Sequence, residues 1–327
     1  LPYPADMYLE GSDQYRGWFN SSLICGVAAH GKSPYKKLVS HGFVLDGKGN
    51  KMSKSLGNTI DPLKLVKMHG SDVFRLWVSS VDYTEDVRIS DELIAQVKES
   101  YRKIRNTYRF LLGNLNGFDP DKNSVPFEEM NEYDQYMMVK LNEVTKDILE
   151  AYEDNNYQEI YKIVNNFVSF TLSNFYLDFT KDILYIEKED SKVRHSVQTV
   201  LYHTLMNLIK LLAPILPYTS EEVYRYVPVR KEESIHLEHM PEVVEYPNKE
   251  VILEKWNAFF DVKDDVYKAL EEARNEKLIG KGLEARVYLH VAGKYKEVVE
   301  SLKDYLKQLF IVSDVVLTDE ELPKYNV

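Results

Sequence analysis

Cysteine is almost absent from this sequence, which has 327 residues and a single cysteine, Cys25. One thiol excludes an internal disulfide and any zinc site built from several cysteines. Cys25 lies in the run SSLICGVAA, where its expected role is that of a small core residue. We therefore assign no chemistry to Cys25 and predict no metal ligands in this chain.

Long apolar runs are absent as well. No stretch approaches the roughly 18 to 20 uninterrupted apolar residues that cross a bilayer. The first residues, LPYPADMYLEGSDQ, have neither the basic flank nor the apolar run of a signal peptide. We therefore expect a cytoplasmic protein without a membrane partner. Because the sequence begins with Leu1 rather than Met, we also expect it to be a piece of a longer protein.

Positive charge is in the minority, with 41 Lys and Arg against 52 Asp and Glu and a formal net charge of -11. This balance argues against general adsorption to nucleic acid but leaves room for a local basic face. With 44% hydrophobic and 28% charged residues, the chain can bury substantial cores. Its length suits about two or three domains.

Three regions of the sequence differ in pattern. Residues 1–88 mix short β-rich runs with glycines, which predicts an α/β segment. Residues 89–240 repeat apolar side chains every three or four positions, over 91–115, 134–156, 158–185 and 192–216, which predicts a mainly α-helical bundle. Residues 241–327 predict a small C-terminal α/β subdomain with a long helix over 248–277, strands over 285–292 and 314–318, and a helix over 296–310.

A basic, glycine-rich loop interrupts the first region. The stretch LDGKGNKMSKSLGN, residues 45–58, carries Lys48, Lys51 and Lys54 from a predicted strand toward a helix start at Asp61-Pro62. Lysines on such a loop can close over a phosphate chain and stabilise the charge that develops there without covalent chemistry. A solvated surface turn is the alternative. Gly70 is expected to end that helix and Ser71 to cap the next one.

Several strings resemble one family. KMSKS, residues 51–55, resembles the signature loop of class I aminoacyl-tRNA synthetases, and YLEGSDQYRGWFNSSL, residues 8–23, resembles the floor of the aminoacyl-adenylate site of the isoleucyl-tRNA synthetases. The usual family form has His where this chain has Tyr15. RKIRNTYRFLLGNLNGF, NFYLDFTKDILY and LAPILPYTSEEVY look like the helical anticodon-binding domain of the isoleucyl, valyl and leucyl enzymes. The resemblance reaches from Leu1 to about Val227 and implies an α/β nucleotide-binding (Rossmann-type) remnant before the bundle.

The resemblance assigns roles to particular residues. Lys54 is expected to be the main catalytic stabiliser of the triphosphate, with Lys51 assisting. The residues expected at ATP and the adenylate are Glu10, Gly11, Asp13, Gln14, His41, Gly42, Ser53 and Ser55. Trp18 is expected to form a flat wall of the amino-acid pocket.

Elementary chemistry is compatible with these roles. Asp13 and Gln14 offer groups suited to ribose hydroxyls, and Gly11 permits close approach of a ligand to the backbone. Duller alternatives remain for each: Asp13 as a helix N-cap, Trp18 as core filler, Glu10 as an exposed charge, and His41 as a structural histidine.

The helix predicted over 91–115 presents a basic face for tRNA. Its members follow spacings of four, three and four: Lys98, Arg102, Arg105 and Arg109. Lys103 lies nearby, and Glu99 is the only acid close in sequence. An apolar stripe for packing runs beside this face: Val97, Tyr101, Ile104 and Tyr108. The alternative is that the basic side chains are solvated or paired with acids of neighbouring helices.

The implied reaction is attack of the isoleucine carboxylate on the α-phosphate of ATP, followed by transfer of the isoleucyl group to isoleucine tRNA. Isoleucine and ATP are thus the expected substrates, Mg²⁺ is implied by ATP, and a monomer is expected. The family's HIGH-type motif and its editing insertion do not occur in the sequence, so we expect the chain alone to be inactive. The alternatives are a non-catalytic tRNA-binding module and a fragment of a valyl-tRNA synthetase.

Overall fold

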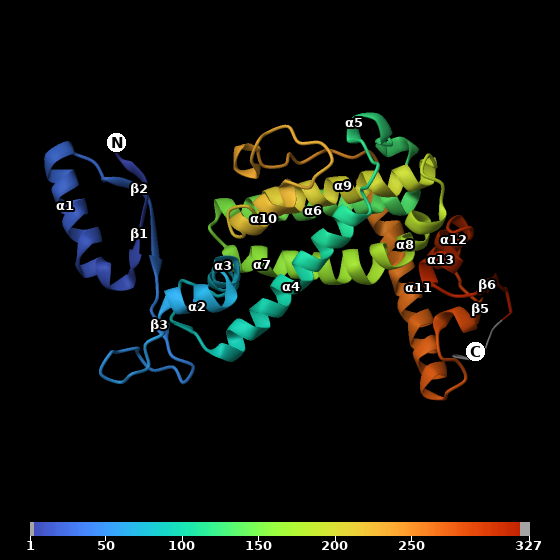
Figure 1. Ribbon diagram of the computed structural model, residues 1–327, viewed down its shortest axis with the longest axis horizontal. Helices are drawn as coiled ribbons and strands as arrows, with labels where there is room; N and C mark the ends of the chain where they lie inside the picture. The colour runs from blue at the N-terminus through green and yellow to red at the C-terminus, as the bar shows by residue number, and fades with distance from the viewer. Residues whose placement is uncertain (1–2, 321–327) are drawn as a thin grey trace. The chain divides into compact units, whose positions relative to one another are not determined.

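The computed structural model describes residues 3–320, and its elements are labelled in Figure 1. Contacts divide the chain into two compact units. The first consists of Leu1–Asn106, Asp147–Asn165 and Leu212–Val223, and the second of Thr107–Lys146, Asn166–Leu211 and Tyr224–Val327. The predicted boundaries after residues 88 and 240 stay predictions. The ends of the predicted outer regions, residues 1–2 and 321–327, lie outside the described residues.

The strands of the first unit form two parallel pairs. Strand β1 (Ala5–Gly11) pairs with β2 (Tyr35–His41), from Ala5 opposite Tyr35 to Gly11 opposite His41. A short 3-10 turn (Ser12–Arg16) and helix α1 (Trp18–His30) connect them, and Figure 1 shows α1 alongside both strands. Strand β3 (Val44–Leu45) pairs with β4 (Val87–Arg88). This β-α-β connectivity gives the predicted α/β character.

Two short helices follow the lysine loop. Helix α2 (Pro62–His69) begins as predicted, because Asp61 is its N-cap and accepts a hydrogen bond from the Leu63 N–H. The prediction that Ser71 caps the next helix is wrong. Helix α3 (Ser71–Ser80) has Ser71 as its first residue and Gly70 at the N-cap, without a capping side chain. Gly70 has φ +89°, a conformation that a residue with a Cβ rarely adopts.

Longer helices complete the first unit and build the second. Helix α4 (Asp91–Gly113) and helix α6 (Glu132–Glu153) each contribute residues to both units. The first unit also contains α7 (Tyr157–Asn166, its last residue excepted) and most of α10 (Pro217–Tyr224). The second contains α5 (Pro120–Asn123), α8 (Leu177–Ile186), α9 (Lys192–Leu212, its last residue excepted) and α11 (Lys249–Asn275), with a π-helical segment at Phe167–Tyr176 between α7 and α8. The predicted predominance of helices in this part is confirmed.

The end of the second unit is a small α/β element. Strand β5 (Arg286–Leu289) pairs in parallel with β6 (Asp314–Leu317). The helix predicted between them is two helices in the structure, α12 (Lys294–Ser301) and α13 (Leu306–Phe310). No helix within residues 3–320 is long and apolar enough to cross a membrane.

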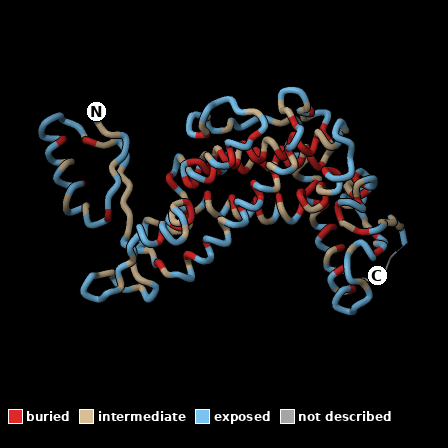
Figure 2. The backbone as a smooth tube through the Cα atoms, in the orientation of Figure 1, coloured by how far each residue is buried: buried red, intermediate tan, exposed pale blue. Residues whose placement is uncertain are grey.

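Burial differs strongly along the chain. In Figure 2 the buried positions, in red, gather on the bundle helices, whereas the N-terminal stretch is mostly pale blue or tan. Within residues 3–60 only four positions are buried: Gly11, Phe19, Gly26 and Pro34. In α9 alone, 13 of 21 residues are buried. The bundle therefore has a core of its own, and the segment that carries the lysine loop has almost none.

Candidate functional site

The ends of β1 and β2 bring several predicted site residues together. Gly11 lies opposite His41 in the parallel register, so both strands end at the same edge. A Cβ on Gly11 would lie 2.6 Å from the Asp13 Oδ1 and 3.6 Å from the His41 Cε1. A side chain at this position would displace the Asp13 carboxylate, whereas the His41 ring lies at ordinary contact distance. Ligands of open parallel sheets bind at this carboxyl edge.

Gly42 has a packing role that explains its identity. A Cβ at this position would lie 2.3 Å from the Glu85 carbonyl carbon and oxygen, and 2.6 Å from the Asp86 nitrogen. The chain at residues 85–86 therefore passes directly over Gly42. The Phe43 N–H donates to the Asp86 Oδ1 at 2.7 Å and holds this crossing. A role of Gly42 beside adenine stays a prediction.

Gln14 and Asp13 form a small polar group after β1. The Gln14 Oε1 accepts from the Trp18 N–H at 2.8 Å, which satisfies a free donor at the start of α1. The Gln14 Nε2 donates to the Asp13 Oδ2 at 3.2 Å. The alternative that Asp13 caps a helix is wrong, because the N-cap position before α1 is Gly17, without a capping side chain, and Gln14 supplies the bond. The side-chain oxygen of Gln14 therefore already accepts a hydrogen bond within the protein. The Glu10 side chain is exposed.

Trp18 lies at the start of α1 with half of its surface open. It is 51% exposed, so the alternative that it fills the core is wrong. Its ring stacks on Tyr8, with centroids 5.7 Å apart and planes inclined by 18°, and Tyr8 in turn contacts Tyr35 at 4.7 Å. The Tyr15 Oη lies 3.2 Å from the Ser40 Oγ. The stacked rings hold Trp18 so that it presents a flat surface.

Residues of the first unit line an apolar cavity of about 650 Å³. His41 lines it together with apolar side chains that include Leu9, Val39 and Phe74. The Arg75 guanidinium at its wall is already bonded to the carbonyl oxygens of Pro214 and Ile215. The cavity therefore offers His41 an apolar environment and little polar recognition.

The lysine loop leaves β3 and enters α2, as predicted. Lys51 and Lys54 are exposed, and the Lys51 Nζ lies 5.6 Å from the centre of the Phe43 ring. Lys54 forms no ion pair with any residue of the described part of the chain, so its ammonium is open to an anion. The Ser53 Oγ lies 3.1 Å from the Ser55 Oγ and accepts from the Leu56 N–H at 3.2 Å. The two serines thus shape the turn between the lysines.

Asp46 is the carboxylate nearest to KMSKS in sequence, and it is fully engaged by hydrogen bonds. Bonds from Asn58 and Asn50, and a weaker one from Lys48, lower the pKa of Asp46 to about 2. In the part of the chain that the structure describes, no three His, Cys, Asp or Glu side chains gather to hold a metal ion. The described residues therefore do not fit a Mg²⁺ site built by the protein alone.

The basic face of α4 is exposed but partly neutralised. Arg102 pairs with Glu99 at 2.8 Å, and Arg105 lies 3.6 Å from Glu222 of α10. The alternative that the basic side chains pair with acids of neighbouring helices is therefore confirmed in part, because the fold brings Glu222 beside the face. Lys98 and Arg109 pair with no acid within residues 3–320. Both ion pairs are exposed to solvent and can exchange for phosphate at little cost.

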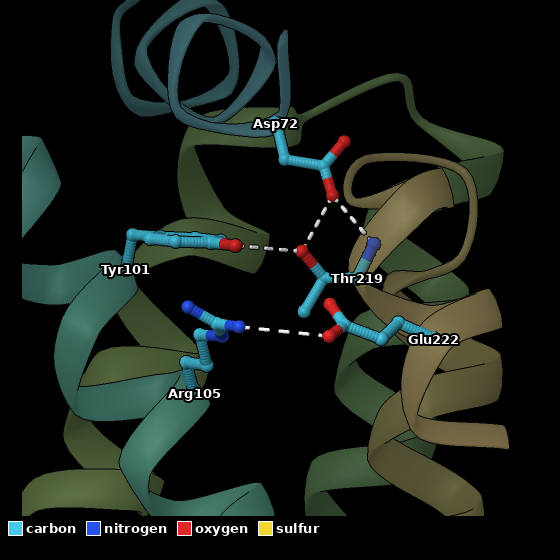
Figure 3. A network of polar contacts seen from close by, with 5 residues as sticks. All are labelled: Asp72, Tyr101, Arg105, Thr219 and Glu222. Atoms are coloured by element: carbon cyan, nitrogen blue, oxygen red, sulfur yellow. Dashed lines mark hydrogen bonds and ion pairs between the residues drawn. The ribbon is translucent and has the colours of Figure 1, made fainter. Parts of the chain in front are cut away.

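Sequence reasoning missed a buried joint beside this face (Figure 3). The Asp72 Oδ2 accepts from the Thr219 N–H at 2.7 Å and from the Thr219 Oγ1 at 2.6 Å. The Thr219 Oγ1 lies 2.9 Å from the Tyr101 Oη. Asp72 of α3 thereby accepts the hydrogen bonds of Thr219 in the first turn of α10. Tyr101 of α4 contacts the same threonine. The only signal in the sequence was that Asp72 is an acid in the first turn of a helix. That position does not reveal that its partner is Thr219, 147 residues away.

Comparison of the sequence matches two families. Residues 1–90 match the family described as tRNA synthetases class I (I, L, M and V). Residues 134–289 match the family described as the anticodon-binding domain of tRNA ligase.

Curated relatives match over the whole chain. The isoleucine–tRNA ligase of Staphylococcus carnosus is 57% identical over 98% of this chain and 35% of that protein. The isoleucine–tRNA ligase of Bacillus mycoides is 55% identical over 99% of this chain and 35% of that protein. The chain thus spans about a third of the length of the curated relatives that it matches.

Solved structures agree at the level of the fold. The ternary complex of Agrobacterium radiobacter K84 LeuRS with tRNA and LeuAMS has a TM-score of 0.60 and 22% identity, over 73% of this chain and 29% of that chain. Mycobacterium tuberculosis methionyl-tRNA synthetase in complex with methionyl-adenylate has a TM-score of 0.57 and 19% identity, over 67% of this chain and 43% of that chain. At such identities the likeness concerns the fold alone.

Proposed function

We propose that the chain belongs to the isoleucine–tRNA ligase family over the 35% of those proteins that it spans, and that it supplies their lysine loop and tRNA-docking helices. In the intact protein the isoleucine carboxylate would attack the α-phosphate of ATP and displace pyrophosphate, and the isoleucyl group of the resulting adenylate would then pass to its tRNA as AMP leaves. The observation that carries this proposal is the 57% identity over 98% of the chain. The chain alone is expected not to aminoacylate.

The nucleotide site would lie at the carboxyl edge of β1 and β2. We propose that these strands belong to a Rossmann-type sheet, which their parallel pairing through α1 supports. Asp13 and Gln14 would face ribose hydroxyls, and His41 and Gly42 would lie beside adenine. Glu10 would face the adenylate, and Trp18 would line the isoleucine pocket with its open ring face.

The lysines would act by electrostatics. Formation of the adenylate moves negative charge onto the departing pyrophosphate, and the exposed Lys54 ammonium, assisted by Lys51, would stabilise that charge. Ser53 and Ser55 would hold the turn that presents both lysines. Magnesium would be carried by the phosphates of ATP, since the carboxylate nearest to KMSKS is already bonded.

Isoleucine-dependent exchange of pyrophosphate into ATP tests the catalytic part of the proposal in the intact protein. Lys54→Ala should lower kcat about 100-fold or more, because a charge that acts in the transition state is lost. Lys48→Ala is the matched control, since Lys48 lies in the same loop but outside KMSKS, and it should change kcat by less than about threefold. Unchanged exchange in Lys54→Ala would overturn the catalytic role and favour a non-catalytic tRNA-binding module.

Binding of this chain to isoleucine tRNA, with valine tRNA as competitor, tests the second part. Preferential binding that weakens steeply as salt rises is expected, because contacts to phosphate release counterions. Arg102→Glu should weaken binding, whereas Lys303→Glu, an exposed lysine of the C-terminal element, should not. Equal binding of both tRNAs, or none, would contradict an autonomous recognition role, and preference for valine tRNA would favour the valyl alternative.

A further inference from the structure

We propose that Asp46 and Asn58 are positioning residues that clasp the two ends of the lysine loop and thereby determine where Lys51 and Lys54 lie. The inference rests on the proposed function, because it gives the clasp a role in that reaction. Neither residue carries a role in the family resemblance described above. Their assignment comes from the hydrogen bonds at the base of the loop.

Asp46 organises the first half of the loop. Its Oδ1 accepts from the Asn50 N–H at 2.8 Å and from the Lys48 N–H at 3.0 Å. The Asp46 N–H donates to the Asn50 carbonyl at 2.9 Å, and the Gly49 N–H donates to the Asp46 carbonyl at 2.9 Å. Gly49 has φ +84°, which this tight turn requires. One carboxylate therefore fixes the turn that leads into KMSKS.

Asn58 closes the loop from its other end. Its Nδ2 donates to the Asp46 Oδ2 at 2.9 Å and to the Lys51 carbonyl at 3.2 Å. Its Oδ1 accepts from the Ser53 N–H at 2.9 Å. A single amide thus holds the residues on both sides of Met52 and joins them to Asp46.

These bonds matter because the loop has no core. Between the two clasp residues no side chain is buried, and Leu56 is among the exposed large hydrophobic residues. Lys54 lies between the points that Asn58 holds and the helix that begins at Pro62. With no buried side chain in the loop and only the Phe43 ring near the Lys51 ammonium, hydrogen bonds at the base of the loop determine where its backbone presents both lysines. A shift of about 1 Å in a charged group can cost about 100-fold in rate.

An exchange of the two side chains tests the clasp. Asn58→Asp places two carboxylates against each other and should lower kcat for isoleucine-dependent pyrophosphate exchange about 10- to 100-fold, with little change in the KM for isoleucine. Asp46→Asn sets two amide donors against each other and should cost about 3- to 10-fold. In the double variant Asp46→Asn with Asn58→Asp, donor and acceptor between residues 46 and 58 are exchanged, but the Lys51 carbonyl loses the amide donor that Asn58 supplied. Its kcat should therefore lie at least about threefold above that of Asn58→Asp without reaching the original value.

Asp61→Asn is the matched control, because Asp61 lies three positions beyond Asn58 and only caps α2. Cleavage by trypsin after Lys51 and Lys54 in this chain gives a readout that is independent of activity. Both single variants should be cut faster than the unmodified chain, and the double variant more slowly than Asn58→Asp, since it restores the bond between residues 46 and 58.

The two proposals fail in different ways. If Lys54→Ala keeps full exchange activity, the proposed function fails whatever the clasp variants do. If Lys54→Ala is inactive while both single clasp variants keep normal kcat and normal cleavage, the clasp is overturned and the function stands. A double variant no faster in exchange than Asn58→Asp, with unfolding curves like those of the unmodified protein, would also overturn the clasp.

Discussion

Residues 3–60 and helix α9 hold their residues in place by different means. The first region has four buried positions in 58 residues, whereas α9 buries 13 of 21. Hydrogen bonds and glycines at close contacts, as at Gly11, Gly42 and the Asp46–Asn58 pair, determine the geometry of the first region. In α9 the interior packing determines it. The residues proposed for catalysis thus lie on a part of the chain with few buried positions, as is common for loops that carry function.

The largest expected effect comes from matched truncations of leucine. Leu205 in α9 is 0% exposed, and Leu9 in β1 is 58% exposed. Leu205→Ala should lower the free energy of unfolding by about 2 to 5 kcal/mol, because it leaves a cavity in a packed core. Leu9→Ala should change it by less than about 0.5 kcal/mol. Urea unfolding followed by circular dichroism measures both, and equal effects would break the contrast between the two regions.

The next prediction concerns a buried carboxylate in the packed helices, whose titration should make the free energy of unfolding depend on pH. Asp134 in α6 is fully buried, and burial raises its pKa to about 6 although Tyr176 and Ser196 donate hydrogen bonds to it. Because this pKa lies above the usual value of 3.8, the folded state binds the proton more tightly than the unfolded state. Stability should therefore fall by about 3 kcal/mol between about pH 4 and pH 7, relative to Asp134→Asn.

Urea unfolding of both proteins across that pH range checks this expectation. The informative quantity is the difference between the two unfolding free energies, since all other titrating groups are shared. If the unfolding free energy of the original protein minus that of Asp134→Asn stays constant with pH, or rises toward neutral pH, the raised pKa is contradicted.

The buried joint at Asp72 should have an intermediate effect. Asp72→Ala removes the acceptor of two buried donors of Thr219 and should cost about 2 kcal/mol of unfolding free energy. Asp72→Asn keeps an acceptor and should cost less. Asp61→Ala, which removes the exposed N-cap of α2, should lower the free energy of unfolding by about 1 kcal/mol and serves as the reference for Asp72→Ala. A cost for Asp72→Ala below that of Asp61→Ala would mean that packing, rather than the joint, holds α3 to α10.

The smallest expected effect is at the exposed pair of Arg105 and Glu222. Glu222→Gln should change the free energy of unfolding by less than about 0.5 kcal/mol, because both side chains are solvated and 3.6 Å apart. The same change frees Arg105 for phosphate, so the salt dependence of tRNA binding should steepen by up to about one phosphate contact. A salt series with isoleucine tRNA measures this. A loss of stability above 1 kcal/mol would show that the pair is structural.

Local features were readable from sequence because their causes are local. The Asp61-Pro62 start of α2, the long helices and the passage from a strand through the lysine loop into a helix depend on residues a few positions apart. The cap expected at Ser71 failed because Gly70 takes the N-cap conformation itself. The roles of the predicted ligand residues stay predictions that the proposed experiments address.

Long-range partners could not be read in this way. Glu222 neutralises part of the basic face from a helix more than 100 positions away, and Thr219 meets Asp72 across 147 positions. The residue types at these positions are ordinary for exposed or first-turn sites. Nothing in their spacing distinguishes a tertiary partner from solvent.

The sequence by itself determined the helical periodicity, the loop with its lysines and the family to which the chain is similar, because each depends on the order of neighbouring residues. Only the tertiary structure decided that Gly11 lies opposite His41, that the chain at residues 85–86 covers Gly42, and that Asn58 reaches back to Asp46. These contacts depend on how separate segments meet in space. Packing and hydrogen bonding determine which segments come into contact, and these contacts cannot be read from the order of residues along the chain.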